Sequence, residues 1–471
     1  MSKKQKNRVP GDGVETLDRI SELPDILLIQ ILSLLLTEDA VTSCVLSKRW
    51  RYLWTSIHTF LFSNRNYNKL ENFISFVDNV LTHSICSKIK KFKLDFHHRD
   101  WKFHLKISQW LNFAVENKVE DVALDAGLCF YPSADDLAYE LPLTIHWVFD
   151  KGLNIAWNFL KSLTLDSIEL EADDIVILLS SCPALETLEL SFCKVCRRIE
   201  ITSSNLKRLT LRYPSEPLNG EYDSLEIFAP HLKHLDISGE LGDFKCMLVN
   251  ISSLVIARLA FSICCITDYW NKEDIKEDSC RDYHQVIGNL ILDYLQKLSY
   301  ATELIIGCWF AEVVFMMKLE GVMLPELRCK CLTLELRVSE YNLYGIASLL
   351  QTSPLLESLN INITYELEQS YFAEVDNINL PSWIPNTVFP NLKNVKIVGC
   401  GTRCLKRWSE EGFYKLFELS YFLLKNAVAL QKLVIVAKRR KCSTCSENCV
   451  SRHLSQLAKK LLDSPRLYTK S

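Results

Sequence analysis

The sequence predicts an α/β protein in which a short helical module precedes a long array of strand–helix repeats. Two observations support this fold class. Residues 18–62 show helical spacing, with apolar residues three and four positions apart. From about residue 89 onward, strand-like and helix-like segments alternate, and one pattern of leucines recurs. Because strands that are joined through helices run parallel, we expect the repeats to stack into a parallel sheet.

The N-terminal module begins with a helix that is predicted to start at Pro24. Proline suits the first helical position, where its missing N–H costs nothing, and Asp25 lies in the first turn, where the helix dipole favours negative charge. Four apolar residues follow at spacings of three and four: Leu27, Ile31, Leu34 and Leu35. They form one apolar stripe along the helix.

Two further helices are predicted in the module, with Thr37 and Ser47 as their N-caps. The third helix carries Trp50, Leu53 and Trp54. A unit this short buries little of its own surface, yet apolar residues lie on several of its faces. It is either a helical subdomain packed on the rest of the chain or a docking module, and the excess of apolar surface favours docking on a partner.

Four short motifs in this module occur in a characteristic order and separation. They are Leu23-Pro24-Asp25, Ile31-Leu32, the run from Val45 to Arg51, and Leu53-Trp54. Together they resemble an F-box. The resemblance implies that residues 18–64 dock on a Skp-type adaptor, which links the chain indirectly to a cullin-based ubiquitin ligase. The residues that we predict to contact the adaptor are Leu23, Pro24, Leu27, Ile31, Leu32, Val45, Trp50 and Trp54.

A leucine pattern of the form L-x-x-L-x-L organises the rest of the chain. Its copies begin at Leu160, Leu185, Leu206, Leu232, Leu356, Leu392 and Leu430. Short helical segments lie between some copies, at residues 173–181 and 345–351. A period in the twenties with this pattern resembles leucine-rich repeats. Each copy has one strand and one helix that cannot bury their apolar faces alone, so residues 65–377 are expected to form an irregular leucine-rich-repeat solenoid with parallel strands.

Segments outside these copies follow the same periodicities. Residues 68–83 and 107–115 show helical spacing, whereas residues 89–96 and 119–124 alternate as strands do. The asparagine of the standard repeat is mostly absent, so regular curvature is not expected. The charged segment 266–285 interrupts the repeats and is predicted to be a loop insertion.

A second resemblance covers residues 378–437. It rests on the run from Leu380 to Pro385, on residues 392–397 and on residues 421–433. These segments resemble an FBD domain, which follows F-box and leucine-rich segments in many plant proteins. The resemblance implies a plant source and an FBD domain that caps the solenoid, with no settled biochemical role. Residues 1–17 and 438–471 are then predicted to be tails, the first of them basic and disordered.

Composition disfavours several classes of function. The net charge of −3 and the isoelectric point near 6.4 argue against nucleic-acid binding, which needs a basic field. No apolar run approaches the ~18 residues that span a membrane, and no signal peptide is recognisable. We therefore expect no nucleic-acid or membrane partner and a nuclear or cytoplasmic location. The eighteen cysteines are expected to be reduced, several of them in apolar strands: Cys129, Cys264, Cys265 and Cys331.

Few residues suggest chemistry. The sequence has no G-x-S-x-G elbow, H-E-x-x-H motif, P-loop or strand-to-helix G-x-G-x-x-G, so it is not predicted to be an enzyme. One cluster, Cys442-x2-Cys445-x3-Cys449-x3-His453, contains the ligand types that zinc prefers. Its compact spacing matches no familiar zinc module, which favours reduced surface cysteines. Neither a metal nor a cofactor is therefore predicted.

Residues between the repeat leucines offer a second candidate surface. The leucines point into the core, so the residues between them face the other way and align across neighbouring strands. On this ladder we predict contacts with a target protein at Glu189, Arg208, Arg212, His234 and Asp236. The two arginines stand out because a guanidinium suits bidentate contact with a carboxylate or phosphate. The alternative for each residue is an ordinary solvated strand position.

Two hypotheses about function follow. In the first, the chain is the substrate receptor of an SCF-type ubiquitin ligase (Skp adaptor, cullin, F-box), and its repeats hold a target protein close to the ubiquitin carrier. Its contribution is then proximity, without catalysis. In the alternative, the chain is a ligand-sensing F-box receptor whose repeat concavity binds a small molecule that joins the target to it.

Overall fold

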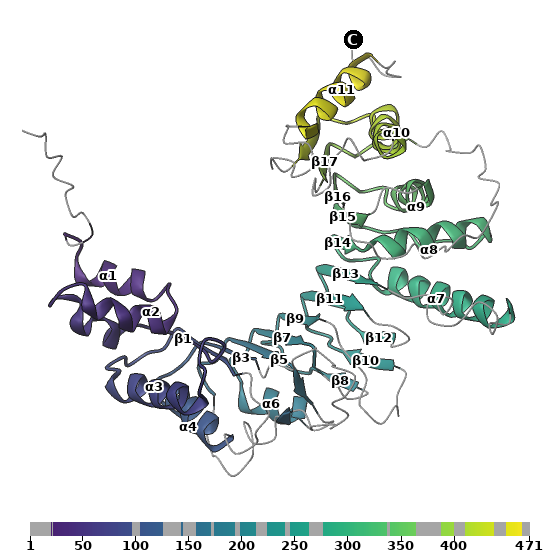
Figure 1. Cartoon of the computed structure of the whole chain (residues 1–471). Coiled ribbons are helices and arrows are strands. Elements are labelled where there is room, and N and C mark those ends of the chain that lie inside the picture. The colour runs from purple at the N-terminus through teal and green to yellow at the C-terminus, as the bar shows by residue number, and fades with distance from the viewer. Residues whose placement is uncertain are drawn as a thin grey trace, which may run out of the picture.

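Repeats of one strand and one helix bury their leucines only by stacking on one another, and the computed structural model in Figure 1 shows the resulting arc. Strands line the inner side of the arc, and helices α7 to α10 lie along its outer side. The structure describes residues 20, 22–96, 104–125, 143–144, 157–170, 174–193, 198–212, 224–240, 245–262, 277–336, 340–363, 388–399, 410–437 and 449–463, and every structural statement below concerns these residues.

The elements of this described part are as follows. The helices are α1 (Asp25–Leu32), α2 (Thr37–Thr42), α3 (Leu70–His83), α4 (His104–Glu116), α6 (Asp174–Ser181), α7 (Glu277–Lys297), α8 (Cys308–Leu319), α9 (Glu340–Gln351), α10 (Glu410–Asn426), α11 (Cys449–Asp463) and the 3₁₀ helices η1 (Ser43–Val45) and η2 (Trp50–Ser56). The main sheet contains β1 (Thr59–Ser63), β2 (Lys91–Asp95), β3 (Asp121–Asp125), β5 (Ser162–Asp166), β7 (Thr187–Ser191), β9 (Arg208–Arg212), β11 (His234–Glu240), β13 (Ile256–Ser262), β14 (Glu303–Ile306), β15 (Cys331–Leu336), β16 (Ser358–Ile363), β17 (Asn394–Gly399) and β18 (Lys432–Ala437). The smaller sheets contain β4 (Leu143–Thr144) with β6 (Ile168–Glu169), and β8 (Arg198–Glu200) with β10 (Ser224–Phe228) and β12 (Lys245–Asn250).

The main sheet is the stack of parallel strands that the leucine pattern predicts. Its thirteen described strands follow chain order from β1 to β18, and each pairs in parallel with the next one in the sheet. Corresponding leucines of neighbouring copies face one another in register, as Leu163, Leu188, Leu209 and Leu235 do. All four are buried. The repeat therefore defines both the strand positions and the core.

Helices cover the outer side of the sheet only in part. The predicted helices at 68–83, 107–115, 173–181 and 345–351 are present as α3, α4, α6 and α9. Between α6 and α7, the short strands β8, β10 and β12 form a separate parallel sheet on the outer side instead (Figure 1). Along the described array the outer side therefore changes from helices to a block of short strands and back to helices, which makes the solenoid irregular.

Hydrogen bonds and ion pairs between turns fix neighbouring copies against each other. Asn205 and Asn391 each donate a side-chain hydrogen bond to the carbonyl oxygen of a proline in the preceding copy, at 2.9 Å to Pro183 and 2.8 Å to Pro354. The first variable position of the pattern adds charge pairs, such as Lys393 with Glu357 at 3.0 Å. These contacts lie directly before and after the first leucine of each copy, so they tie the turn of one copy to the turn of the copy before it.

The N-terminal helices differ from the sequence prediction at their starts. Pro24 precedes α1 instead of being its first residue, although Asp25 lies in the first turn as predicted. Thr37 and Ser47 are not N-caps: α2 begins at Thr37 itself, and the third helix is a 3₁₀ helix that begins at Trp50. The Thr37 hydroxyl accepts a hydrogen bond from another segment, and this tertiary contact replaces the predicted cap.

Two predicted irregular segments contain helix. Residues 277–285, part of the predicted loop insertion, belong to α7. Residues 449–463, part of the predicted C-terminal tail, form α11, which packs on α10 and β18. Since β18 is the last strand of the described sheet, α11 shields one side of that edge. Strands β17 and β18 extend the same sheet, whereas the predicted domain boundary at 378 lies outside the described residues.

Candidate interaction surfaces

Helix α1 buries one stripe and leaves another in water. Leu28 and Leu32, four positions apart, are buried against the core, as the short helix has room for one inward face. Several large apolar side chains around α1, the turn after it, η1 and η2 are exposed. We call this set the N-terminal apolar surface: Ile26, Leu27, Ile31, Leu34, Leu35, Leu36, Val45, Leu46 and Tyr52. Exposed apolar residues gathered on so small a unit are typical of a surface that binds a partner.

The predicted adaptor-contacting residues divide into two groups. Leu27, Ile31, Val45 and Pro24 are exposed, and Leu23 and Trp54 are half-buried. Two others cannot belong to a free surface: Leu32 is 1% exposed and Trp50 is 7% exposed. Both belong to the core of the chain, so the expectation that they face a partner was wrong.

Four strongly exposed apolar residues were not among those predicted: Ile26, Leu34, Leu46 and Tyr52. Leu34 could have been found, because it belongs to the apolar stripe that the helical spacing defines. No periodicity marks Tyr52, since η2 is a 3₁₀ helix with three residues per turn.

Arg49, which directly precedes η2, contacts the start of α1. Its guanidinium donates to Asp25 at 2.6 and 2.8 Å, and it also donates to the carbonyl oxygen of Leu23. The start of α1 is thereby tied to the segment just before η2. Because Asp25 is largely exposed and Arg49 is partly exposed, this pair contributes little to stability and mainly fixes geometry.

The N-terminal unit is attached to the first strand of the sheet through side-chain hydroxyls. The N–H of Leu61 in β1 donates to Thr37 Oγ1 at 2.7 Å, and the N–H of His58 donates to Ser33 Oγ at 3.3 Å. Strand β1 is the N-terminal edge of the described sheet, where such N–H groups have no neighbouring strand. The helices therefore cap this edge and are held directly against it.

Tyr67 adds a second contact at this junction. Its hydroxyl donates to the carboxylate of Glu38 in α2. Burial, and then the negative charge of Glu38, raise the pKa of Tyr67 to about 12. The phenol therefore remains a donor at neutral pH, and this bond supports the same orientation as the Thr37 contact.

The second candidate surface is the inner side of the main sheet, which we call the strand face. It carries the residues that alternate with the buried leucines. All five predicted target-contacting residues lie there, on β7, β9 and β11. The register places Glu189 opposite Thr210, Arg208 opposite His234, and Asp236 opposite Thr210. The sequence thus located this surface correctly, while target binding itself stays a prediction.

Three of the five residues are engaged in ion pairs. Arg212 Nε lies 2.8 Å from Glu189 Oε1. Asp236 lies 3.2 Å from Arg258 of β13, whose guanidinium also lies 3.1 Å from Glu335 of β15. Burial disfavours the charged form of Arg258, but the two carboxylates outweigh it and raise the pKa of this side chain. The sequence ladder missed Arg258 because its copy has Ala257 where the pattern requires leucine.

Arg208 and His234 are not paired in this way. Arg208 is exposed. Burial lowers the pKa of His234, the positive charge of Arg208 lowers it further, and Glu303 opposes both. The Nδ1 atom of His234 is enclosed and has no hydrogen-bond partner in the described part of the chain.

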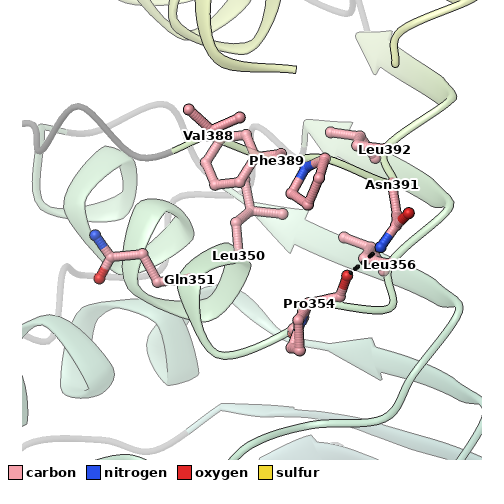
Figure 2. Close-up of a pocket in the computed structure, with 10 residues that line it drawn as sticks. Leu350, Gln351, Pro354, Leu356, Val388, Phe389, Asn391 and Leu392 are labelled. Atoms are coloured by element: carbon pink, nitrogen blue, oxygen red, sulfur yellow. Dashed lines mark hydrogen bonds between the residues drawn. The ribbon is translucent and has the colours of Figure 1, made fainter. Parts of the chain in front are cut away.

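A cavity of about 250 Å³ lies near the C-terminal part of the array (Figure 2). It opens between the end of α9, the turn at Pro354 and residues 388–392, where Asn391 bonds to Pro354. Its walls are mainly apolar: Leu350, Leu356, Val388, Phe389, Pro390 and Leu392. These residues belong to the core and to turns, and the cavity lies off the strand face. It therefore gives no support to a ligand site in the repeat concavity.

Buried thiols account for several of the cysteines. Cys182, Cys193 and Cys246 are free and buried, and desolvation raises the pKa of each to about 12. No metal-binding group of three or more side chains is found among the described residues. Cys442 and Cys445 lie outside them, as do Cys129, Cys264 and Cys265. None of the described helices is long and apolar enough to cross a membrane.

This combination of a helical N-terminal unit and a parallel leucine-rich array defines a class of two-part interaction proteins, and comparison with known proteins identifies the family. Residues 20–62 match the F-box domain, and residues 80–269 and 318–467 match the LRR domain described for At1g61320/AtMIF1. The chain belongs to the F-box/LRR-repeat family.

Relatives in Arabidopsis thaliana share this organisation. The F-box/LRR-repeat protein At3g03360 is 29% identical over 74% of this chain and 71% of its own length. F-box/LRR-repeat protein 13 is 28% identical over 100% of this chain and 99% of its own length. The F-box/FBD/LRR-repeat protein At1g78750 is 27% identical, with 98% and 97% covered.

Proposed function

We propose that this protein is the substrate-recognition subunit of an SCF-type ubiquitin ligase. In this proposal the N-terminal apolar surface docks on a Skp-type adaptor, the adaptor connects it to a cullin, and the strand face binds a target protein. The observation that carries the proposal is the N-terminal apolar surface in a chain of the F-box/LRR-repeat family. Burial of exposed aliphatic side chains against a partner is a main source of the free energy of association.

The protein would contribute proximity and no chemistry of its own. A receptor that holds a target beside the ubiquitin carrier converts a bimolecular encounter into a local one. The direct contact between α2 and β1 suits this task, because it fixes the strand face relative to the adaptor surface. We place the protein in the nucleus or the cytoplasm, where such ligases act.

The C-terminal assignment is part of the proposal. We assign residues 378–437 to an FBD domain, supported by the motifs quoted above and by relatives whose names include FBD. In the described part of this region, β17 and β18 extend the repeat sheet. An FBD domain here would therefore act as the last section of the solenoid.

The test of adaptor docking uses Leu34→Asp and Val45→Asp. Both side chains project into solvent, with 82% and 77% of their surface exposed, so neither change should affect folding. Each places a carboxylate in an apolar interface, where an unpaired charge is costly. We expect adaptor affinity, measured by biolayer interferometry with purified adaptor, to fall about 30-fold or more.

The control is Met323→Asp, which puts the same charge on an apolar side chain that is 88% exposed but lies after α8, in the array. It should bind the adaptor like the wild type. Leu23 is less suitable for substitution because it is half-buried and its carbonyl oxygen accepts from Arg49. Wild-type affinity in both aspartate variants would show that the adaptor does not use this surface.

A further inference from the structure

Charged side chains near the middle of the strand face are mostly neutralised by their neighbours. Arg212 pairs with Glu189, and Arg258 bridges two carboxylates. Arg208 is different, because its side chain is exposed and no carboxylate lies within ion-pair distance among the residues described. The strand face therefore holds one uncompensated guanidinium in its central part. An unpaired arginine on a binding face is available to a partner's anion.

His234 lies directly beside this guanidinium. The two residues are register partners on adjacent strands, which lie about 4.8 Å apart. Because Nδ1 is enclosed without an acceptor in the described structure, a neutral ring carries its proton on Nε2. The Nε2–H is then a donor that can act together with the guanidinium. Two adjacent donor groups, one of them charged, form a suitable site for a planar anion.

We propose that Arg208 and His234 form a carboxylate-binding subsite, which receives an aspartate or glutamate side chain of the target protein. The inference rests on the proposed function, since it specifies what the strand face recognises. A guanidinium offers two parallel N–H donors to the two oxygens of a carboxylate, and the imidazole adds a third donor to one of those oxygens. A neutral amide side chain at that point would lose the charge-assisted part of this interaction.

Neighbouring residues favour a single carboxylate over a more highly charged group. Thr187 and Ile256 flank the pair in the same register row, so one side offers a hydroxyl and the other an apolar contact. Glu303 is the register partner of Ile256 on the far side. The negative charge of Glu303 disfavours a doubly charged phosphate more than it disfavours one carboxylate. Glu189 and Asp236 lie one position further along β7 and β11 in the alternating pattern, where both are already paired with arginines.

The test is an NMR titration of the full chain with a hexaglutamate peptide. Histidines are labelled with ¹³C at Cε1, and the resonance of His234 is identified by its loss in His234→Gln. We expect hexaglutamate to shift this resonance and to raise the pKa of His234, because a bound carboxylate stabilises the imidazolium. Hexaglutamine should leave the resonance in place.

Two variants locate the anion. Arg208→Gln should weaken hexaglutamate binding about tenfold or more, because it removes a charge-assisted bidentate contact. The matched control is Arg212→Gln, an arginine on the same strand whose charge is already paired, and it should retain most of the affinity. Circular dichroism of both variants should match that of the wild type, since both side chains are exposed.

Several outcomes overturn the subsite. They are an unmoved His234 resonance, an equal response to hexaglutamine, or an equal loss of affinity in both arginine variants. Tighter binding of a hexapeptide that carries phosphoserine would overturn the assignment to a carboxylate. Adaptor binding is measured separately on the same samples. Its failure would contradict the proposed function, while the peptide response would still decide the subsite.

Discussion

The N-terminal apolar surface and the strand face are both exposed, but for different physical reasons. In the N-terminal unit, the helices are too short to bury more than one stripe, so Leu34 and Val45 have no neighbours to pack against. On the strand face, successive residues of each strand point alternately toward the core and away from it, and the polar residues point away from the core. Pairs of these side chains, such as Arg212 with Glu189, stabilise one another. The N-terminal apolar surface lacks a partner in the free chain, whereas many charged side chains of the strand face already form ion pairs with one another.

This difference indicates how the two surfaces can specialise. An apolar patch gains free energy from burial against any partner of matching shape, so it suits a partner whose surface does not vary. The residues of the strand face do not pack in the core, which is formed by the leucines that alternate with them. These polar residues can therefore change from one chain to another without loss of the fold, which suits the recognition of different targets.

The largest expected effect contrasts a buried repeat leucine with an exposed one in the N-terminal unit. Leu209→Ala opens a cavity in the centre of the stack and should lower the free energy of unfolding by about 2–5 kcal/mol. Leu34→Ala removes the same atoms from a solvated position and should change it by less than about 0.5 kcal/mol. Urea denaturation followed by circular dichroism measures both. Equal losses would mean that Leu34 is buried in the free chain.

A smaller effect is expected at the junction between the two regions. Thr37→Val keeps the shape of the side chain but removes the acceptor for the Leu61 N–H, which should cost about 1–3 kcal/mol. Hydrogen exchange at the Leu61 amide should accelerate. Thr37→Ser keeps the hydroxyl and should retain protection at that amide. If both variants lost protection at the Leu61 amide equally, the Thr37 hydroxyl would not be the group that protects this edge of β1.

The sequence predicted the array well because its signal is repeated. Seven copies of one pattern define the strands, and neighbouring copies constrain the register, so a weak match in one copy does not matter. Strand β13, whose copy has Ala257, and strand β14 do not match the full pattern. They nevertheless pair in parallel with their neighbours in the same sheet.

Features that depend on tertiary contact were not predictable in this way. Leu32 and Trp50 carry the same apolar signal as the exposed residues around them, and only packing decides which of them are buried. Thr37 has the composition of an N-cap, but it bonds to a strand more than twenty residues away. The bridge from Arg258 to Glu335 joins residues 77 positions apart. Local spacing contains no information about such pairs.

The smallest effect that we predict compares the two regions through pH. The pKa of His234 on the strand face is lowered in the folded chain, chiefly by burial, with Arg208 adding to the shift and Glu303 opposing it. As pH falls below about 6.5, the ordinary value, the unfolded chain therefore takes up a proton at this position more readily than the folded chain does. The free energy of unfolding should fall over this window and level off below the lowered pKa.

Replacing His234 by Gln should remove this part of the acid sensitivity. Because the imidazole is only partly buried, solvent screening should keep the difference below about 1 kcal/mol. The measurement is urea denaturation of the wild type and the variant at pH 7.5 and 5.5, with the change between the two pH values compared. His58→Gln, which replaces an exposed histidine beside β1, is the control in the other region and should follow the wild type. An unchanged acid response in His234→Gln would mean that the strand face does not resist protonation of this residue.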